Sequence, residues 1–227
     1  MPAPDLKPII VCVHGAWQDT SCFDIIRAQL STYDYRSTAV PLPSTGASNP
    51  SQQTHLEDVI AIRNTLEQLI LVGEKDVLLV LHSYGGVPGC GAIKGLEKST
   101  RKSIGGRGGI IGCVFIAAIL PLKRQSLSDV LKDWEFPYMT VEGDYVKISS
   151  PEYHFYNDLP PAMADHYSSK IRSQSKFSFA SKAESVPWDL TLPLTYLVCN
   201  NDRILPIDIQ DAMIDRLLSK DSFLSEK

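Results

Sequence analysis

The chain lacks the features of several classes of protein. None of its segments reaches the roughly 18 apolar residues of a membrane span, and residues 1–8 lack the positive start and apolar stretch of a signal peptide. Its 22 Lys and Arg are balanced by 26 Asp and Glu, which leaves a net charge of −4 and no broad basic field. We therefore expect a cytoplasmic protein that binds neither nucleic acid nor membrane.

Cysteine and glycine patterns typical of metal and nucleotide sites are also missing. The five cysteines are an odd number without a C-x-x-C pair, so we expect free thiols instead of disulfides or a zinc site. The glycine-rich stretch Gly105–Gly112 does not match G-x-G-x-x-G and precedes a strand instead of following one, so we interpret it as a loop. No cofactor and no metal are expected.

Short apolar runs alternate with helical patterns along the chain. The segment Leu56–Leu71 has apolar residues near a 3.6-residue period with Thr54 as a candidate N-cap, and a second helix is predicted from just after Ser83 to Leu96. This alternation predicts a doubly wound α/β fold with a mostly parallel sheet. The predicted buried strands are Pro8–Val13, Ser37–Val40, Val77–Leu81, Ile110–Ile119 and Leu194–Cys199.

The alternation is interrupted once. Between Leu122 and Pro187 the apolar runs give way to mixed aromatic and polar residues with several prolines. We interpret residues 122–187 as an inserted cap, called the lid below. The core then consists of residues 1–121 and 188–227, in one domain that is large enough to bury a core.

The run Val77–Val87 is the most informative motif. A buried strand stops at Ser83 and two glycines follow, which is a version of the nucleophile elbow G-x-S-x-G. Gly85 fits the pattern and Leu81 departs from it. A serine at a helix N-cap is the alternative interpretation, but two glycines at a helix start favour a nucleophile.

Two more predicted strands end in residues that complement Ser83. After the first, Gly15 lets the chain turn so that the Ala16 N–H, together with the Tyr84 N–H, stabilises an oxyanion. After the last, Asp202 is placed to orient a catalytic imidazole. An ordinary turn at Gly15 and an aspartate bonded to its own backbone are the alternatives.

These residues give the chain a resemblance to the α/β-hydrolases. It is similar to the branch that includes plant methyl esterases, hydroxynitrile lyases and fungal esterase-like proteins of secondary metabolism. The resemblance implies an α/β-hydrolase fold, hydrolysis of carboxylic esters through an acyl-serine, Ser83 as nucleophile, Ala16 and Tyr84 as oxyanion donors, and Asp202 as acid. The matching motifs are His14–Trp17, Pro41–Gly46, Asp58–Leu66, Leu81–Gly86, Phe155–Pro160, Trp188 and Thr195–Asp202.

The family's catalytic histidine is not found at its usual place. In such proteins it follows the acid, in a loop between one more strand and a closing helix, but residues 203–227 contain no histidine. After a helix predicted over Ile207–Leu218, the ending resembles that loop with its histidine replaced. We therefore expect the last strand and helix to be missing, which would expose apolar sheet surface and favour a homodimer or poor solubility.

Two histidines in the lid, His154 and His166, are candidates for a substitute base, because triads are defined by geometry and not by chain order. Three explanations stay open: a truncated or misspliced product, a pseudo-enzyme that binds a small molecule, and an enzyme, such as a lyase or a C–C bond-forming enzyme, that uses the pocket with another base. Aromatic residues suggest an apolar pocket for a medium-sized hydrophobic ester, lactone or polyketide-like substrate, with core packing as the alternative. The predicted pocket residues are Trp17, Trp134, Tyr138, Phe155 and Tyr156.

Overall fold

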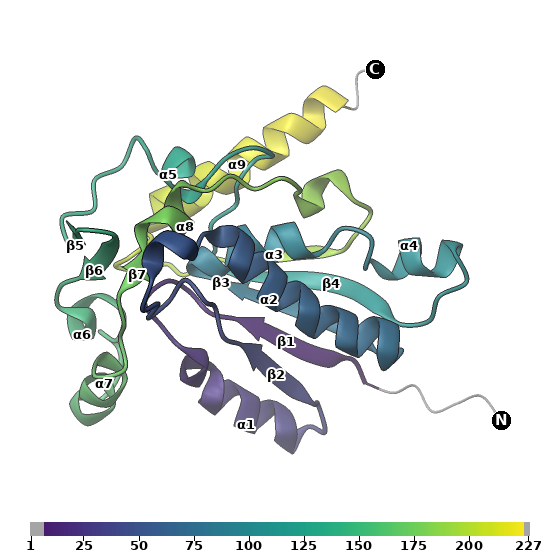
Figure 1. Ribbon diagram of the computed structural model, residues 1–227, viewed down its shortest axis with the longest axis horizontal. Coiled ribbons are helices and arrows are strands. Elements are labelled where there is room, and N and C mark those ends of the chain that lie inside the picture. The colour runs from purple at the N-terminus through teal and green to yellow at the C-terminus, as the bar shows by residue number, and fades with distance from the viewer. Residues whose placement is uncertain (1–6, 225–227) are drawn as a thin grey trace.

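The protein is built on a five-stranded, wholly parallel β-sheet in the order β2-β1-β3-β4-β8 (Figure 1). The computed structural model describes residues 7–224. The parallel pairing of all five strands confirms the predicted α/β sheet. Its strands are β1 (Ile9–Val13), β2 (Ser37–Val40), β3 (Asp76–His82), β4 (Gly109–Ile116) and β8 (Leu194–Leu197).

Alternate residues of the strands face two helical layers. Val11 and Leu79 pack with Ile62 of α2 in the main core, whereas Ile10 and Cys12 pack with Phe23 on the opposite face. Both faces are covered, which explains why the strand sequences are continuously apolar. The helical segments outside the lid are η1 (Thr20–Phe23), α1 (Asp24–Thr32), η2 (Pro50–Gln52), α2 (His55–Glu67), η3 (Gln68–Val72), η4 (Ser83–Gly85), α3 (Gly86–Ala92), α4 (Lys98–Ser103), η5 (Pro187–Asp189) and α9 (Ile207–Leu224).

Helix α2 begins where the sequence predicts. The Thr54 side chain and the Glu57 carboxylate form a reciprocal capping box, with the Thr54 N–H 2.7 Å from Glu57 Oε2. Helix α3 is shorter than predicted, because it ends at Ala92 and Gly95 adopts a positive φ of 83° that an α-helix cannot contain.

Several predicted elements end at other residues, and strand β8, for example, stops at Leu197 instead of Cys199. Strand β4 stops at Ile116 instead of continuing to Ile119, since Ala117 has a left-handed φ of 39°. Helix α9 runs to Leu224, so the expected loop after Leu218 is helical as far as that residue. The remainder of that predicted loop, residues 225–227, lies outside the described residues.

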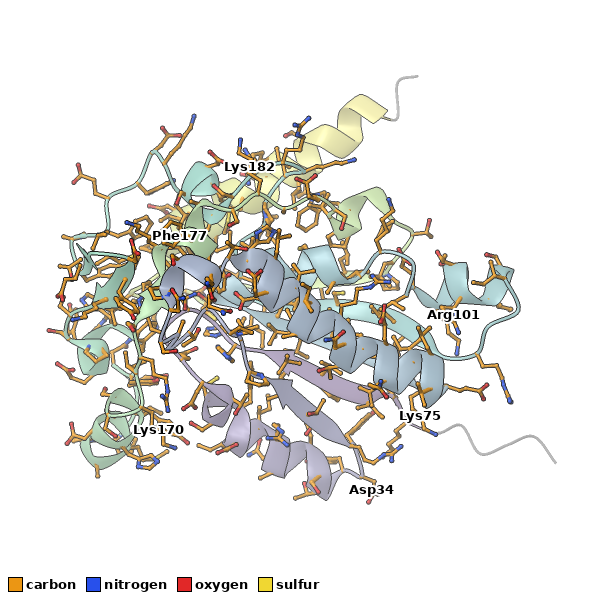
Figure 2. The ribbon with its side chains drawn as sticks, viewed as in Figure 1. Asp34, Lys75, Arg101, Lys170, Phe177 and Lys182 are labelled. Carbon is orange, nitrogen blue, oxygen red and sulfur yellow. The ribbon has the colours of Figure 1, made fainter. Side chains whose placement is uncertain are left out.

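The lid contains its own antiparallel sheet in the order β5-β6-β7 and lies at the carboxyl ends of the parallel strands (Figure 1). Lys170 lies on this side of the molecule, and Lys75 and Arg101 mark the opposite end (Figure 2). None of the helices within residues 7–224 has the length and apolar character needed to cross a bilayer. The lid elements are α5 (Leu127–Val130), β5 (Met139–Glu142), β6 (Tyr145–Ile148), α6 (Pro151–His154), α7 (Pro161–Ser168), β7 (Gln174–Ser175) and α8 (Lys176–Ala180).

Candidate active site

Ser83 stands at a sharp turn between strand β3 and the short helix η4. Its φ is 52°, in the left-handed region that residues other than glycine rarely adopt. An N-cap serine normally has extended backbone, so this conformation differs from the alternative role considered above. The Ile119 N–H donates to the Ser83 carbonyl over 3.0 Å, which ties the turn to the end of the neighbouring strand.

Close packing around the turn explains its glycines and its leucine. A methyl group at Gly85 would lie 2.6 Å from the carbonyl oxygen of His14, so a larger residue is excluded there. Leu81 occupies the position where the motif usually has glycine, and its Cδ2 lies only 2.3 Å from the place of a methyl group on Gly89. Gly89 in α3 therefore provides the space that Leu81 needs.

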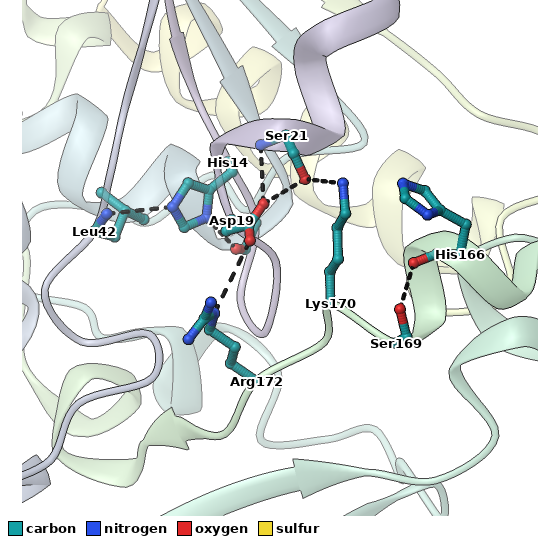
Figure 3. A network of polar contacts seen from close by, with 9 residues as sticks. His14, Asp19, Ser21, Leu42, His166, Ser169, Lys170 and Arg172 are labelled. Carbon is teal, nitrogen blue, oxygen red and sulfur yellow. Dashed lines mark hydrogen bonds and ion pairs between the residues drawn. The ribbon is translucent and has the colours of Figure 1, made fainter. Parts of the chain in front are cut away.

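The loop after β1 approaches this turn from the adjacent strand. Leu42 donates its N–H to Nε2 of His14 over 3.2 Å, and Nδ1 of His14 lies 2.8 Å from the Gly15 carbonyl oxygen (Figure 3). Burial lowers the pKa of His14, so the ring is neutral. Its two ring nitrogens connect the loop after β1 to Leu42 and to the Gly15 carbonyl group. Trp17, two residues after Gly15, has a left-handed φ of 64°.

Ser83 lines two cavities of different character. The first is a narrow apolar cavity of about 30 Å³, and the second has a volume of about 310 Å³ and a more polar wall. Ala16, Trp17, Tyr84 and Tyr138 line the first together with Leu127, Leu131, Phe136, Met139, Phe179, Ile119, Ile204 and Leu205. The second is lined by Gln18, His82, His154, Phe155, Asn157, Asp158, Cys199, Asn200, Asn201, Asp202 and Ile204.

Asp202 faces the larger cavity from the turn after β8. Its Oδ1 accepts hydrogen bonds from the N–H groups of Ile204 and Leu205 over 2.8 and 2.9 Å. These are the local backbone bonds of a turn aspartate, and the same side chain also shares the cavity wall with Ser83. Burial raises the pKa of Asp202, and the two backbone bonds partly oppose that effect.

Of the two lid histidines, the structure brings one to this cavity. His154 ends α6 and lines the larger cavity with Ser83 and Asp202. His166 lies on α7 beside Lys170 and is not part of either cavity wall (Figure 3). His82 also lines the larger cavity, and burial lowers its pKa to about 4, so its imidazole is a weak base.

The predicted pocket aromatics divide in the same way. Trp17 and Tyr138 line the apolar cavity, and Phe155 lines the polar one. Tyr156 lies instead in a separate small pocket beside Tyr167. Trp134 is 40% exposed and lines neither cavity at Ser83.

Sequence reasoning did not identify a buried polar cluster behind the elbow, formed by Ser44, Asp58, Tyr84 and Gln174. One signal was present in the sequence. Asp58 lies among the buried positions of α2 at helical spacing from Ile62, and a carboxylate on such a face needs buried partners. In the described part of the chain, no group of three His, Cys, Asp or Glu side chains could hold a metal ion.

Comparison with known proteins gives consistent matches over most of the chain. Residues 10–222 match the model of the alpha/beta hydrolase family. The chain is 32% identical to the alpha/beta hydrolase nvfD of Aspergillus novofumigatus over 90% of this chain and 82% of that protein. It is 25% identical to methylesterase 1 of Arabidopsis thaliana, over 92% and 84%. The structure of polyneuridine aldehyde esterase superposes with a TM-score of 0.74 at 17% identity, covering 93% of this chain and 87% of that one.

Proposed function

The chain belongs to the alpha/beta hydrolase family, and from this premise we propose that it hydrolyses carboxylic esters through an acyl-serine intermediate on Ser83. One observation carries the proposal: Ser83, in its left-handed turn, lines an apolar cavity with Ala16 and Tyr84 and a polar cavity with Asp202. A candidate nucleophile, two candidate oxyanion donors and a carboxylate thus line the two cavities that meet at Ser83.

The reaction follows the usual order of acyl transfer. Ser83 Oγ attacks the ester carbonyl while a base accepts its proton, and the tetrahedral oxyanion is held by the N–H groups of Ala16 and Tyr84. The intermediate collapses, and the alcohol leaves with the proton from the base. Water then attacks the acyl-serine and gives a proton to the same base, which returns that proton to Ser83 Oγ as the acid leaves.

We assign the role of base to His154. Two contacts hold the lid around His154 against the turn that carries Asp202. The Tyr138 hydroxyl donates to the Ile204 carbonyl oxygen over 2.5 Å, and the Arg203 guanidinium lies 4.3 Å from the centre of the Tyr153 ring. The His154 ring in turn packs 4.5 Å from the ring of Tyr138. Its Nδ1 is shielded from solvent and has no hydrogen-bond partner among the described residues, so no other group occupies that atom.

The two cavities define the substrate by size and polarity. The apolar cavity, at about 30 Å³, accepts a small apolar group beside Ser83 and needs side-chain movement to admit a longer one. The rest of a medium-sized hydrophobic ester then occupies the larger cavity of about 310 Å³. A role in fungal secondary metabolism remains a prediction from the sequence resemblance, and a cytoplasmic location remains a separate prediction from the sequence composition.

A fluorophosphonate probe followed by peptide mapping tests the nucleophile. We expect labelling of Ser83, loss of labelling in Ser83→Ala, and turnover of p-nitrophenyl acetate that depends on the same residue. A folded protein whose Ser83 does not react would contradict the proposal and favour the alternative, a non-catalytic protein that binds a small molecule.

A matched pair of variants tests the base. His154→Gln should slow p-nitrophenyl acetate turnover by on the order of 10²-fold, the scale of general-base catalysis. His166→Gln, also in the lid, should leave the rate within about twofold, since His166 lines neither cavity at Ser83. Equal rates in the two variants would contradict the assignment of His154 without affecting that of Ser83.

A further inference from the structure

We propose that Gln174 of the lid is a positioning residue that fixes both oxyanion donors through one buried chain of hydrogen bonds. The inference rests on the proposed function, because it gives the N–H groups of Ala16 and Tyr84 a catalytic use. It goes beyond that function by assigning the geometry of the site to a side chain that lines neither cavity at Ser83.

Four hydrogen bonds connect the two sides of the site. The Trp17 N–H donates to Gln174 Oε1 over 3.4 Å, and Gln174 Nε2 donates to Ser44 Oγ over 2.6 Å. Ser44 Oγ donates to Asp58 Oδ2 over 2.5 Å. The Tyr84 hydroxyl donates to the same Asp58 oxygen, also over 2.5 Å. The chain therefore begins at the amide next to Ala16 and ends on the side chain of the other donor residue.

The connecting groups are fully buried. Ser44, Asp58, Tyr84 and Gln174 each have a relative exposure of 0%. A buried polar group that loses its partner bears the full cost of desolvation, so each bond in the chain constrains the next. Three additional bonds reinforce the cluster: the Ser44 N–H donates to Asp58 Oδ1, the Thr45 hydroxyl donates to Gln174 Oε1, and Gln174 Nε2 also donates to Ser178 Oγ.

The beginning of the chain controls the first donor. Trp17 has a φ of 64°, a backbone conformation that persists only where its surroundings hold it. Its N–H is held by Gln174, and its carbonyl oxygen accepts the Arg172 N–H over 2.8 Å. Lid residues 172–174 therefore hold both polar groups of Trp17, the residue that directly follows the donor Ala16.

The far end of the chain controls the second donor. Tyr84 directly follows the nucleophile, and its hydroxyl is anchored on Asp58. Its ring packs 5.6 Å from that of Phe179, a residue of the lid helix α8. Fixing the Tyr84 side chain at its tip restricts rotation of the elbow that carries its N–H. One lid segment thus orients donors from two different strand ends.

The experiment compares Gln174→Met, which keeps the side-chain length, with Tyr84→Phe, which keeps the Tyr84 N–H, and with the double variant. Ser175→Ala is the matched control: it removes a buried hydrogen bond from the neighbouring residue, to the Pro50 carbonyl oxygen at 2.7 Å, outside the chain described above. The readouts are kcat and KM for p-nitrophenyl acetate, the rate of fluorophosphonate labelling of Ser83, and the melting temperature.

We expect each single variant to lower kcat by about tenfold or more with KM changed by less than about twofold, since the interaction acts on the transition state. The kcat of the double variant should be about that of the less active single variant, because both substitutions break the same chain of hydrogen bonds. Ser175→Ala should lower the melting temperature without this loss of kcat.

Unchanged kcat in folded Gln174→Met and Tyr84→Phe would overturn the inference, as would an equal loss in Ser175→Ala. Tyr84→Phe carries the test by itself if Gln174→Met does not fold. If Ser83 of the unmodified protein does not react at all, the proposed function fails and this inference with it. If Ser83 reacts but is indifferent to these variants, only the positioning role of Gln174 is lost.

Discussion

Gly15 packs directly against Ser83: a methyl group at Gly15 would stand 2.8 Å from the Ser83 Cβ and 3.2 Å from its Oγ. The loop after β1 therefore leaves no room for a side chain between itself and Ser83. This contact joins the ends of strands β1 and β3, which are far apart in the sequence.

Gly15→Ala should displace either the loop or the serine. We expect the rate of Ser83 labelling and of ester turnover to fall by on the order of 10²-fold, the effect of a misplacement of about 1 Å. Gly95→Ala is the control, because the φ of 83° at Gly95 would strain an alanine there while its methyl group meets nothing within 4 Å. It should lose stability and retain activity, and an active Gly15→Ala protein would refute the close-packing argument.

Local patterns were sufficient to predict the elements that bring the site together. The strand before Ser83, the turn at Gly15 and the capping box at Thr54 each depend on neighbours within a few residues, which the sequence displays. Parallel strands then place their carboxyl ends at one edge, so Ser83 and Asp202 reach the same cavity.

Relationships between distant residues were not predictable in the same way. Leu81 fits in place of the motif's glycine only because Gly89 in the following helix leaves it space. The backbone conformation of Trp17 depends on a hydrogen bond to Gln174, near the end of the lid. Similarly, the sequence does not distinguish His154 from His166. Only the structure shows that the His154 ring packs on Tyr138, whose hydroxyl bonds to Ile204 in the turn that carries Asp202. Single-sequence periodicity contains no information on such contacts.

The narrow apolar cavity predicts a preference for short acyl groups. Leu131 forms part of its wall, so Leu131→Ala should enlarge it and raise kcat/KM for p-nitrophenyl octanoate relative to acetate by about tenfold or more. Leu159→Ala, a lid substitution outside both cavity walls at Ser83, should leave that ratio unchanged. An unmodified protein that already prefers octanoate would show that the apolar cavity does not bind the acyl chain.

Asp58 should make stability depend on pH. Burial raises its pKa to about 6, above the usual value near 3.8, so the folded state favours the neutral acid. Its contribution to stability is complete below pH 3.8 and is lost as the pH rises through 6. We therefore expect the free energy of unfolding of the unmodified protein, relative to that of Asp58→Asn, to fall by up to about 3 kcal/mol between pH 4 and 7. Urea denaturation of both proteins at each pH measures this difference.

Glu57 provides a control of opposite sign on the same helix. Its hydrogen bonds with Thr54 hold its pKa below the usual value, so its contribution is present at neutral pH and is lost as the pH falls. Glu57→Gln should change the pH dependence in the direction opposite to Asp58→Asn. The same direction of change in both variants would show that Asp58 does not favour its neutral form in the folded state.

The outer edge of β8 should cause self-association. Strand β8 pairs only with β4 among the described strands, and Leu194, Leu197 and Val198 are 39%, 49% and 39% exposed. An unpaired edge with apolar side chains is a template for a second copy of the chain, so we expect dimers at micromolar concentration in sedimentation velocity. Leu197→Lys should shift the protein to monomer. Leu56→Lys, at an equally exposed position on α2, should not, and a monodisperse unmodified monomer would contradict the prediction.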